Sequence, residues 1–143
     1  MTRYLLDTNI LSNIVKSSPS SSLLDWMAAR PDEDLFIASL TLGEISRGID
    51  ELPAGRRRQA LEQWFAGPDG PAALFAGRVL PFDARAALIW GRLMAAGRAA
   101  GRPRSALDMI IAATAEANDC IVVTDNERDF ADIPYVNPVR PPD

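Results

Sequence analysis

Residues 4–11 read YLLDTNIL, and this stretch decides the expected fold. Residues 4–6 form a short apolar run that is typical of a buried strand, and residues 7–9 (DTN) are typical of a turn and a helix cap. The apolar residues among 10–15 then recur at helical spacing. The stretch predicts a strand, a turn and a helix, with Asp7 at the carboxyl end of the strand.

The alternation of strands and helices continues along the chain. Further strands are expected at residues 35–38, 79–80 and 121–124, with an edge strand at 135–136, and helices at residues 23–30, 41–51, 56–65, 86–97 and 105–118. The helices at 41–51 and 56–65 are expected to form a hairpin, and the breaker-rich residues 67–71 (GPDGP) a surface loop. Because parallel strands are usually joined through a helix, this order predicts an α/β fold with a parallel sheet covered on both faces.

Composition sets the scale of the molecule. A chain of 143 residues that is 48% hydrophobic can bury a core without disulfides, so we expect a single domain over residues 1–143. No apolar run approaches the roughly 20 residues that span a bilayer, and residues 1–6 carry no recognisable leader. The expected location is therefore the cytoplasm, with no membrane partner.

The residues that are missing exclude most catalytic chemistry. The chain contains no histidine, which rules out Ser-His-Asp hydrolysis, Cys-His nucleophiles and ordinary zinc sites. Cys120 is the only cysteine, so no internal disulfide or thiolate cage can form. The net charge of −4 argues against a surface that binds nucleic acid as a whole, although it permits a basic groove. Carboxylates that hold a hard cation become the leading option.

Four acidic residues are placed where such a site would form. Asp7 and Asp125 follow the first and fourth strands, and ligands of a parallel sheet bind beyond the carboxyl ends of its strands. Glu44 and Asp108 are each expected in the first turn of a helix. Converging carboxylates repel one another unless they bind cations, and Mg²⁺ and Mn²⁺ prefer oxygen ligands of this kind. The acids together predict a divalent metal site.

Each acid also has a purely structural interpretation. The spacings Thr41-x-x-Glu44 and Ser105-x-x-Asp108 both match a capping box, in which the acid accepts a backbone N–H. Asp7 would serve as a helix cap, and residues 125–126 would form a turn. For each acid, the sequence pattern leaves both the metal-binding role and the structural role open.

Four segments resemble the PIN-domain nucleases in order and spacing across nearly the whole chain. They are residues 5–11 (LLDTNIL), 43–45 (GEI), 108–115 (DMIIAATA) and 123–130 (VTDNERDF). Residues 52–58 (LPAGRRR) and 80–83 (LPFD) are similar to the VapC-type toxins of toxin-antitoxin pairs, and to their FitB-like branch in particular. The resemblance implies a three-layer α/β/α sandwich around a mostly parallel sheet of four to five strands. It also implies RNA cleavage that depends on Mg²⁺ or Mn²⁺, and inhibition by a cognate VapB-type antitoxin.

The same resemblance implies roles for individual residues. Asp7 and Asp108 would be metal ligands, and Glu44 would complete the acidic site and help to activate water. The fourth acidic position is left open among Asp125, Asn126 and Asp129. The expected hydrogen-bonding partners around these acids are Thr8, Asn9, Thr124 and Asn126.

Other residues and partners complete the expectation. Arg102 and Arg104 precede the helix of Asp108, so they are candidates for contact with RNA phosphate, although a solvated helix face is also open to them. We expect a homodimer that forms through apolar helix faces. Given the resemblance, the expected reaction is endonucleolytic hydrolysis of single-stranded RNA.

Two other functions compete with this prediction. A phosphatase of the haloacid-dehalogenase type also has an aspartate after its first strand, but it needs a second aspartate two residues on, where this chain has Asn9. A catalytically silent PIN module that acts only as a protein-interaction partner is the other alternative. The acids at Asp7, Glu44 and Asp108 argue against it.

Overall fold

The computed structural model describes residues 1–140, so the last three residues of the expected domain lie outside the described part. Its strands are β1 (Arg3–Leu6), β2 (Leu35–Ala38), β3 (Val79–Leu80), β4 (Cys120–Val123) and β5 (Tyr135–Val136). Its helices are α1 (Thr8–Ile14), α2 (Ser21–Ala28), α3 (Ser39–Asp50), α4 (Arg56–Ala66), α5 (Pro71–Leu74), α6 (Ala84–Ala99) and α7 (Ala106–Ala117). Two short 3-10 helices add η1 (Asp32–Asp34) and η2 (Glu127–Phe130).

The strands form one sheet in the order β3-β2-β1-β4-β5, and every pair in it is parallel. The chain winds outward from β1 to β2 and β3, and then returns to the other side of β1 to form β4 and β5. The winding direction therefore reverses between β1 and β4. In an open parallel sheet the crevice at such a reversal, beyond the carboxyl ends of the strands, is the usual ligand site.

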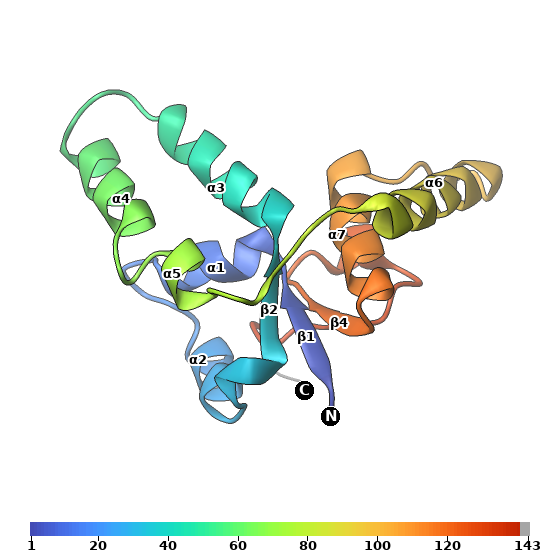
Figure 1. Ribbon diagram of the computed structural model, residues 1–143, viewed down its shortest axis with the longest axis horizontal. Helices are drawn as coiled ribbons and strands as arrows, with labels where there is room; N and C mark the ends of the chain where they lie inside the picture. The colour runs from blue at the N-terminus through green and yellow to red at the C-terminus, as the bar shows by residue number, and fades with distance from the viewer. Residues whose placement is uncertain (141–143) are drawn as a thin grey trace.

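Helices cover both faces of the sheet, as the α/β/α expectation requires (Figure 1). On one face, Leu5 and Val122 pack with Met109 of α7, and α6 lies against α7. On the other face, Leu6 and Val123 pack with residues of α1 and α2 and with Phe75, which follows α5. Since consecutive strand residues point to opposite faces, the unbroken apolar runs of β1 and β4 supply both cores. The predicted fold class is confirmed, with five strands, and no helix within residues 1–140 is long and apolar enough to cross a membrane.

Two local predictions differ from the structure. Residues 67–70 do form a loop between α4 and α5, with Pro68 and Asp69 exposed, but Gly70 and Pro71 are buried and α5 begins at Pro71. A Cβ at Gly70 would lie 2.3 Å from the carbonyl oxygen of Phe65, so the chain turns tightly against the end of α4 here. The helix expected from Thr41 begins two residues earlier, at Ser39. Thr41 therefore lies inside α3 and cannot cap it.

Candidate active site

Asp7 lies at the junction of β1 and α1, and it is almost completely buried. Its backbone N–H donates to the carbonyl of Val123 at 2.9 Å, which fixes it beside the end of β4. Its extended backbone ends the strand, and its Oδ1 accepts the N–H of Thr8 at 2.8 Å as the N-cap of α1. Asp7 therefore caps α1, as its structural interpretation predicted. Only 4% of it is exposed, so the same residue also places a buried carboxylate at the sheet edge.

The second oxygen of Asp7 is held by two side chains from the expected set. Thr124 donates its hydroxyl to Oδ2 at 2.8 Å, and Asn9 donates its amide to the same oxygen at 3.2 Å. The Asn9 amide also lies 3.2 Å from the hydroxyl of Thr124. Asp7 is thereby held in one orientation by groups from α1 and from the end of β4.

Glu44 reaches the site from α3. Its Oε1 accepts the hydroxyl of Thr8 at 2.7 Å, and the Thr8 hydroxyl also lies 3.3 Å from that of Thr41. Thr41 is fully buried, one turn before Glu44 on α3. The Thr41-x-x-Glu44 spacing thus builds a hydrogen-bonded chain to Thr8, and the capping-box interpretation fails because α3 begins at Ser39.

Asp108 enters the site from the first turn of α7. The hydroxyl of Ser105 caps this helix and accepts the N–H of Asp108 at 3.2 Å. The amide of Asn126 lies 3.4 Å from Oδ2 of Asp108 and donates to Oδ2 of Asp129 at 2.8 Å. Asn126 therefore connects Asp108 to Asp129 of η2.

An open cavity of about 420 Å³ collects these groups. Four acids and one cation share its walls with four small polar residues; the lining consists of Asp7, Thr8, Asn9, Ser12, Asn13, Lys16, Glu44, Asp108 and Asp125. The sequence analysis had not selected Ser12, Asn13 or Lys16. Ser12 and Asn13 follow Asn9 by three and four residues, so helical spacing was the available signal.

Two carboxylates of this cavity, those of Asp7 and Asp108, have a raised pKa. Burial is the main cause that raises the pKa of Asp7 to about 6, with further increases from Asp108 and Glu44 against the hydrogen bonds from Thr124 and Thr8. The pKa of Asp108 is also raised, first by burial and then by Asp129 and Glu44, while Ser105 lowers it. Like charges in a partly dry cleft favour either protonation or a bound cation.

The donor set fits a hard divalent ion. Carboxylate oxygens dominate it, and Mg²⁺ usually keeps several waters and takes only one or two carboxylates directly. Within residues 1–140 no group of three or more Asp, Glu or Cys side chains is already arranged to hold a metal ion. Asp7 and Asp108, which repel each other across the cavity, are the pair best placed to share an ion.

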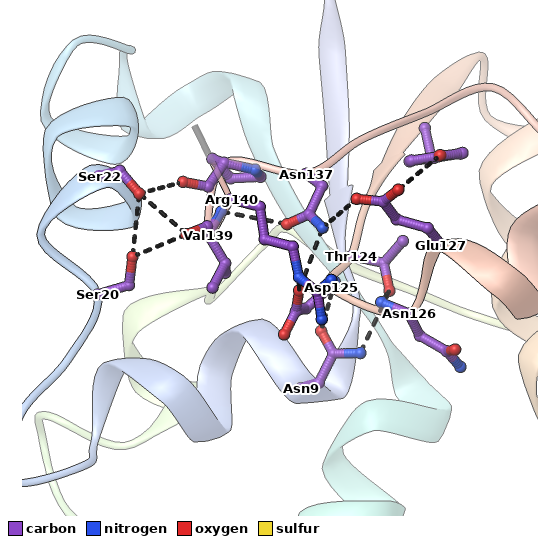
Figure 2. A network of polar contacts seen from close by, with 12 residues as sticks. Asn9, Ser20, Ser22, Thr124, Asp125, Asn126, Glu127, Asn137, Val139 and Arg140 are labelled. Atoms are coloured by element: carbon purple, nitrogen blue, oxygen red, sulfur yellow. Dashed lines mark hydrogen bonds and ion pairs between the residues drawn. The ribbon is translucent and has the colours of Figure 1, made fainter. Parts of the chain in front are cut away.

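Asp125 lines the cavity, yet its carboxylate is engaged elsewhere (Figure 2). Its Oδ1 accepts from Nδ2 of Asn137 and from Nε of Arg140, each at 3.1 Å. Its backbone N–H donates to Oδ1 of Asn9 at 3.1 Å. The acid that approaches Asp108 is Asp129, through Asn126, and nothing in the sequence pattern selected Asn137 or Arg140.

The two arginines named for RNA contact differ in their surroundings. Arg102 is exposed in the segment between α6 and α7. Only 17% of the Arg104 side chain is exposed, and it reaches the carbonyl of Asp129 at 3.5 Å and the carboxylate of Asp132 at 3.8 Å. The contacts of Arg104 therefore favour a role in fixing η2, whereas Arg102 stays available to phosphate.

The PIN domain family matches residues 4–135. VapC ribonuclease Y4jK of Sinorhizobium fredii is 36% identical over 139 residues, which cover 96% of this chain and 98% of the relative. The chain belongs to the PIN-domain family, as a VapC-type ribonuclease toxin. Toxin FitB of Neisseria gonorrhoeae is 32% identical to this PIN-domain chain, over 94% of it and 96% of the relative. The structure of FitAB bound to an IR36 DNA fragment superposes with a TM-score of 0.87 at 30% identity, covering 98% of both chains.

Proposed function

We propose that this VapC-type toxin hydrolyses RNA phosphodiester bonds internally, at a Mg²⁺ or Mn²⁺ site held by Asp7, Asp108 and Glu44. The observation that carries the proposal is the cavity at the end of β1 and β4 that all three acids line, in which the pKa of Asp7 and that of Asp108 are both raised by burial and by neighbouring carboxylates. A divalent cation relieves that repulsion best, and the oxygen donors suit it. Mg²⁺ is the expected ion, and Mn²⁺ accepts the same ligands.

The residues divide the chemistry as follows. A bound divalent ion supplies charge stabilisation and makes a coordinated water easier to deprotonate. Asp7 and Asp108 would hold the ion. Asp7 is fixed by Thr8, Asn9 and Thr124, and Asp108 by its place in the first turn of α7. Glu44, whose Oε1 is held by the Thr8 hydroxyl, accepts the proton of the attacking water at Oε2. The water oxygen bonds to phosphorus as the bond from phosphorus to the leaving ribose oxygen breaks, and that oxygen takes up a proton.

Asp129 is the better candidate for the fourth acidic position. Its Oδ2 shares the amide of Asn126 with Asp108, and Asp129 raises the pKa of Asp108. Asp125 is instead paired with Arg140 at 3.1 Å. We propose that Asp129 supports the ion from the side of Asp108, and that Asp125 contributes from the rim of the cavity.

A VapB-type antitoxin is the proposed inhibitor. The likeness to FitAB, a toxin-antitoxin complex, supports a protein partner of this kind. A groove of about 790 Å³ lies between α1, α3 and α4, and it reaches Thr8 and Glu44 at the edge of the active site. Its lining includes the apolar residues Leu11, Ile45, Ile49, Leu52, Leu61 and Trp64. An antitoxin segment seated there would bury apolar side chains and cover the acids at the same time.

Cleavage of total cellular RNA by the purified protein tests the proposal. With Mg²⁺ or Mn²⁺ we expect discrete cuts that EDTA abolishes and that sequencing of the new ends places in one class of RNA. Asp7→Ala should lose at least about a hundredfold in rate, because a metal ligand disappears. Asp25→Ala, which removes an exposed acid on α2, should cut like the wild type.

The decisive comparison is between the wild type and Asp7→Ala. Equal cutting by wild type and Asp7→Ala, or cutting that persists in EDTA, would contradict the proposed site. No cutting by any of the proteins under any metal condition would favour the silent interaction module instead.

A further inference from the structure

Residues 137–140 (NPVR) form a C-terminal strap that passes beside the active site. The hydroxyl of Ser22 donates to the carbonyls of Pro138 at 2.7 Å and of Val139 at 3.1 Å, which ties the strap to α2. The side chain of Val139 packs against the core on the face of α1 and α2. These contacts make the strap a built part of the fold (Figure 2).

The strap grips one acid of the cavity. Asn137 and Arg140 both donate to the same oxygen, Oδ1 of Asp125, at 3.1 Å. Asn137 is itself oriented, since its Oδ1 accepts the N–H of Val139 at 3.2 Å and its amide donates to Glu127 at 2.6 Å. Two donors on one oxygen restrict the rotation of the Asp125 carboxylate.

Asp125 is also coupled to the centre of the site. Its N–H donates to Oδ1 of Asn9 at 3.1 Å, and the amide of Asn9 donates to Asp7 at 3.2 Å. A continuous chain of hydrogen bonds therefore runs from the strap through Asp125 and Asn9 to Asp7. The position of the strap and the geometry of the buried acid are linked.

The ion pair in this chain is too exposed to serve mainly for stability. The side chain of Arg140 is 72% exposed and that of Asp125 is 35% exposed, and pairs of this kind contribute little to folding. The pair does change the charge of the cavity, because it places a guanidinium against one of four acids that line it. Its main consequence is electrostatic and geometric.

We propose that Asn137 and Arg140 are positioning residues of the nuclease site: they hold Asp125 at the rim and reduce the negative charge that the cavity presents to a cation. The inference rests on the proposed metal site. It means that the C-terminal strap sets the affinity for the ion, and that releasing Arg140 gives Asp125 freedom to turn toward the ion.

The test is a titration of the metal-free full chain with Mn²⁺. Binding is measured by calorimetry and by the electron paramagnetic resonance signal of free Mn²⁺. Arg140→Gln should bind Mn²⁺ about fivefold more tightly than the wild type, because it frees the Asp125 carboxylate to act on the ion, an effect of about one unit charge a few ångströms away in watery surroundings. Arg56→Gln, which removes an exposed arginine at the start of α4, should change the affinity by less than about twofold.

A double-mutant cycle separates positioning from a general loss of positive charge. In the Asp125→Asn background, Arg140→Gln should have only a small effect, because the carboxylate it controls has been neutralised. Arg140→Lys should restore much of the wild-type affinity. Thermal unfolding of each variant checks that the fold persists.

The outcomes distinguish this inference from the function on which it rests. Wild-type binding that Asp108→Asn abolishes, but that Arg140→Gln leaves unchanged or weakens, would overturn the positioning role alone. An equal gain from Arg140→Gln with and without Asp125 would also overturn it. Absence of Mn²⁺ binding by the wild type would overturn the proposed metal site together with the role of the strap.

Discussion

The chemistry of the site concentrates on one residue, Asp7. The strand that precedes it and the helix that follows it are both encoded within residues 4–11, so its place at the sheet edge is predictable from sequence. Its burial and its three side-chain and backbone donors come from residues that lie up to 117 positions away. Local sequence thus specifies where the acid lies, and tertiary contacts specify how strongly it resists ionisation.

The raised pKa of Asp7 makes a prediction about stability. Because the folded pKa of about 6 exceeds the unfolded value of 3.8, protonated Asp7 favours the folded state. This contribution is complete below pH 3.8 and is lost as the pH rises through about 6. The shift corresponds to roughly 3 kcal/mol in the free energy of unfolding.

Urea unfolding in EDTA at several pH values measures this contribution. Asp7→Asn cannot ionise, so its stability relative to the wild type should improve by about 1 to 3 kcal/mol between pH 4 and pH 7. Taking the difference between the two proteins cancels the titration of the other acids. Parallel pH profiles for wild type and variant would show that Asp7 ionises normally.

At the scale of elements, α6 and α7 support the side of the site that holds Asp108, whereas α3 carries Glu44. α7 presents Asp108, and the segment before it brings Arg104 against η2, which holds Asp129. Gly97 near the end of α6 makes this approach possible, since a Cβ there would lie 2.6 Å from Cγ of Arg104 and 2.9 Å from the carbonyl of Arg102. The packing at the end of α6 therefore supports Arg104, which in turn contacts η2 and its Asp129.

Two glycines of α6 test this dependence. Gly97→Ala should lower the free energy of unfolding by about 1 to 3 kcal/mol through overpacking, and should reduce RNA cleavage because Arg104 and η2 are displaced. Gly91→Ala is the matched control: nothing lies within 4 Å of its Cβ position, so it should stabilise α6 by up to about 1 kcal/mol and leave cleavage unchanged. Equal stability of the two variants would contradict the role of Gly97.

The elements also show what sequence could and could not predict. Local sequence predicts the strands, which are bounded by turn residues, and the helices, which have apolar periodicity. The alternation of these elements then predicts the parallel sheet. The start of α3 could not be predicted, because β2 ends at Ala38 and α3 begins at Ser39, with no turn residues between them. The choice between Asp125 and Asp129 depends on side chains at 126, 137 and 140, and no local pattern reports their contacts.

At the scale of the whole molecule, exposed apolar side chains around α6 are the candidates for the interface of the predicted homodimer. Leu88 on α6 is 79% exposed, the largest exposed fraction of any large hydrophobic side chain of residues 2–140. Leu107 at the start of α7 and Phe82 before α6 are also exposed. We propose that these residues contribute to the expected homodimer.

Sedimentation velocity tests the dimer and its surface together. The wild type should sediment as a dimer at micromolar concentration, and Leu88→Glu should shift it toward the monomer, because a charge would be buried at the interface. Leu24→Glu on α2 also removes an exposed leucine and should leave the dimer intact. A monomeric wild type at high concentration would refute the homodimer, and a dimeric Leu88→Glu variant would place its interface elsewhere.

The central claim is that Asp7, which follows β1, and the acids of α3 and α7 share one divalent ion at the end of the sheet. Anomalous diffraction at the manganese edge, from crystals equilibrated with Mn²⁺, tests it most directly. The account predicts a peak within about 2.5 Å of carboxylate oxygens of Asp7 or Asp108, inside the cavity beside Glu44. A peak outside this cavity, or an ordered cavity without manganese at saturating concentration, would contradict it.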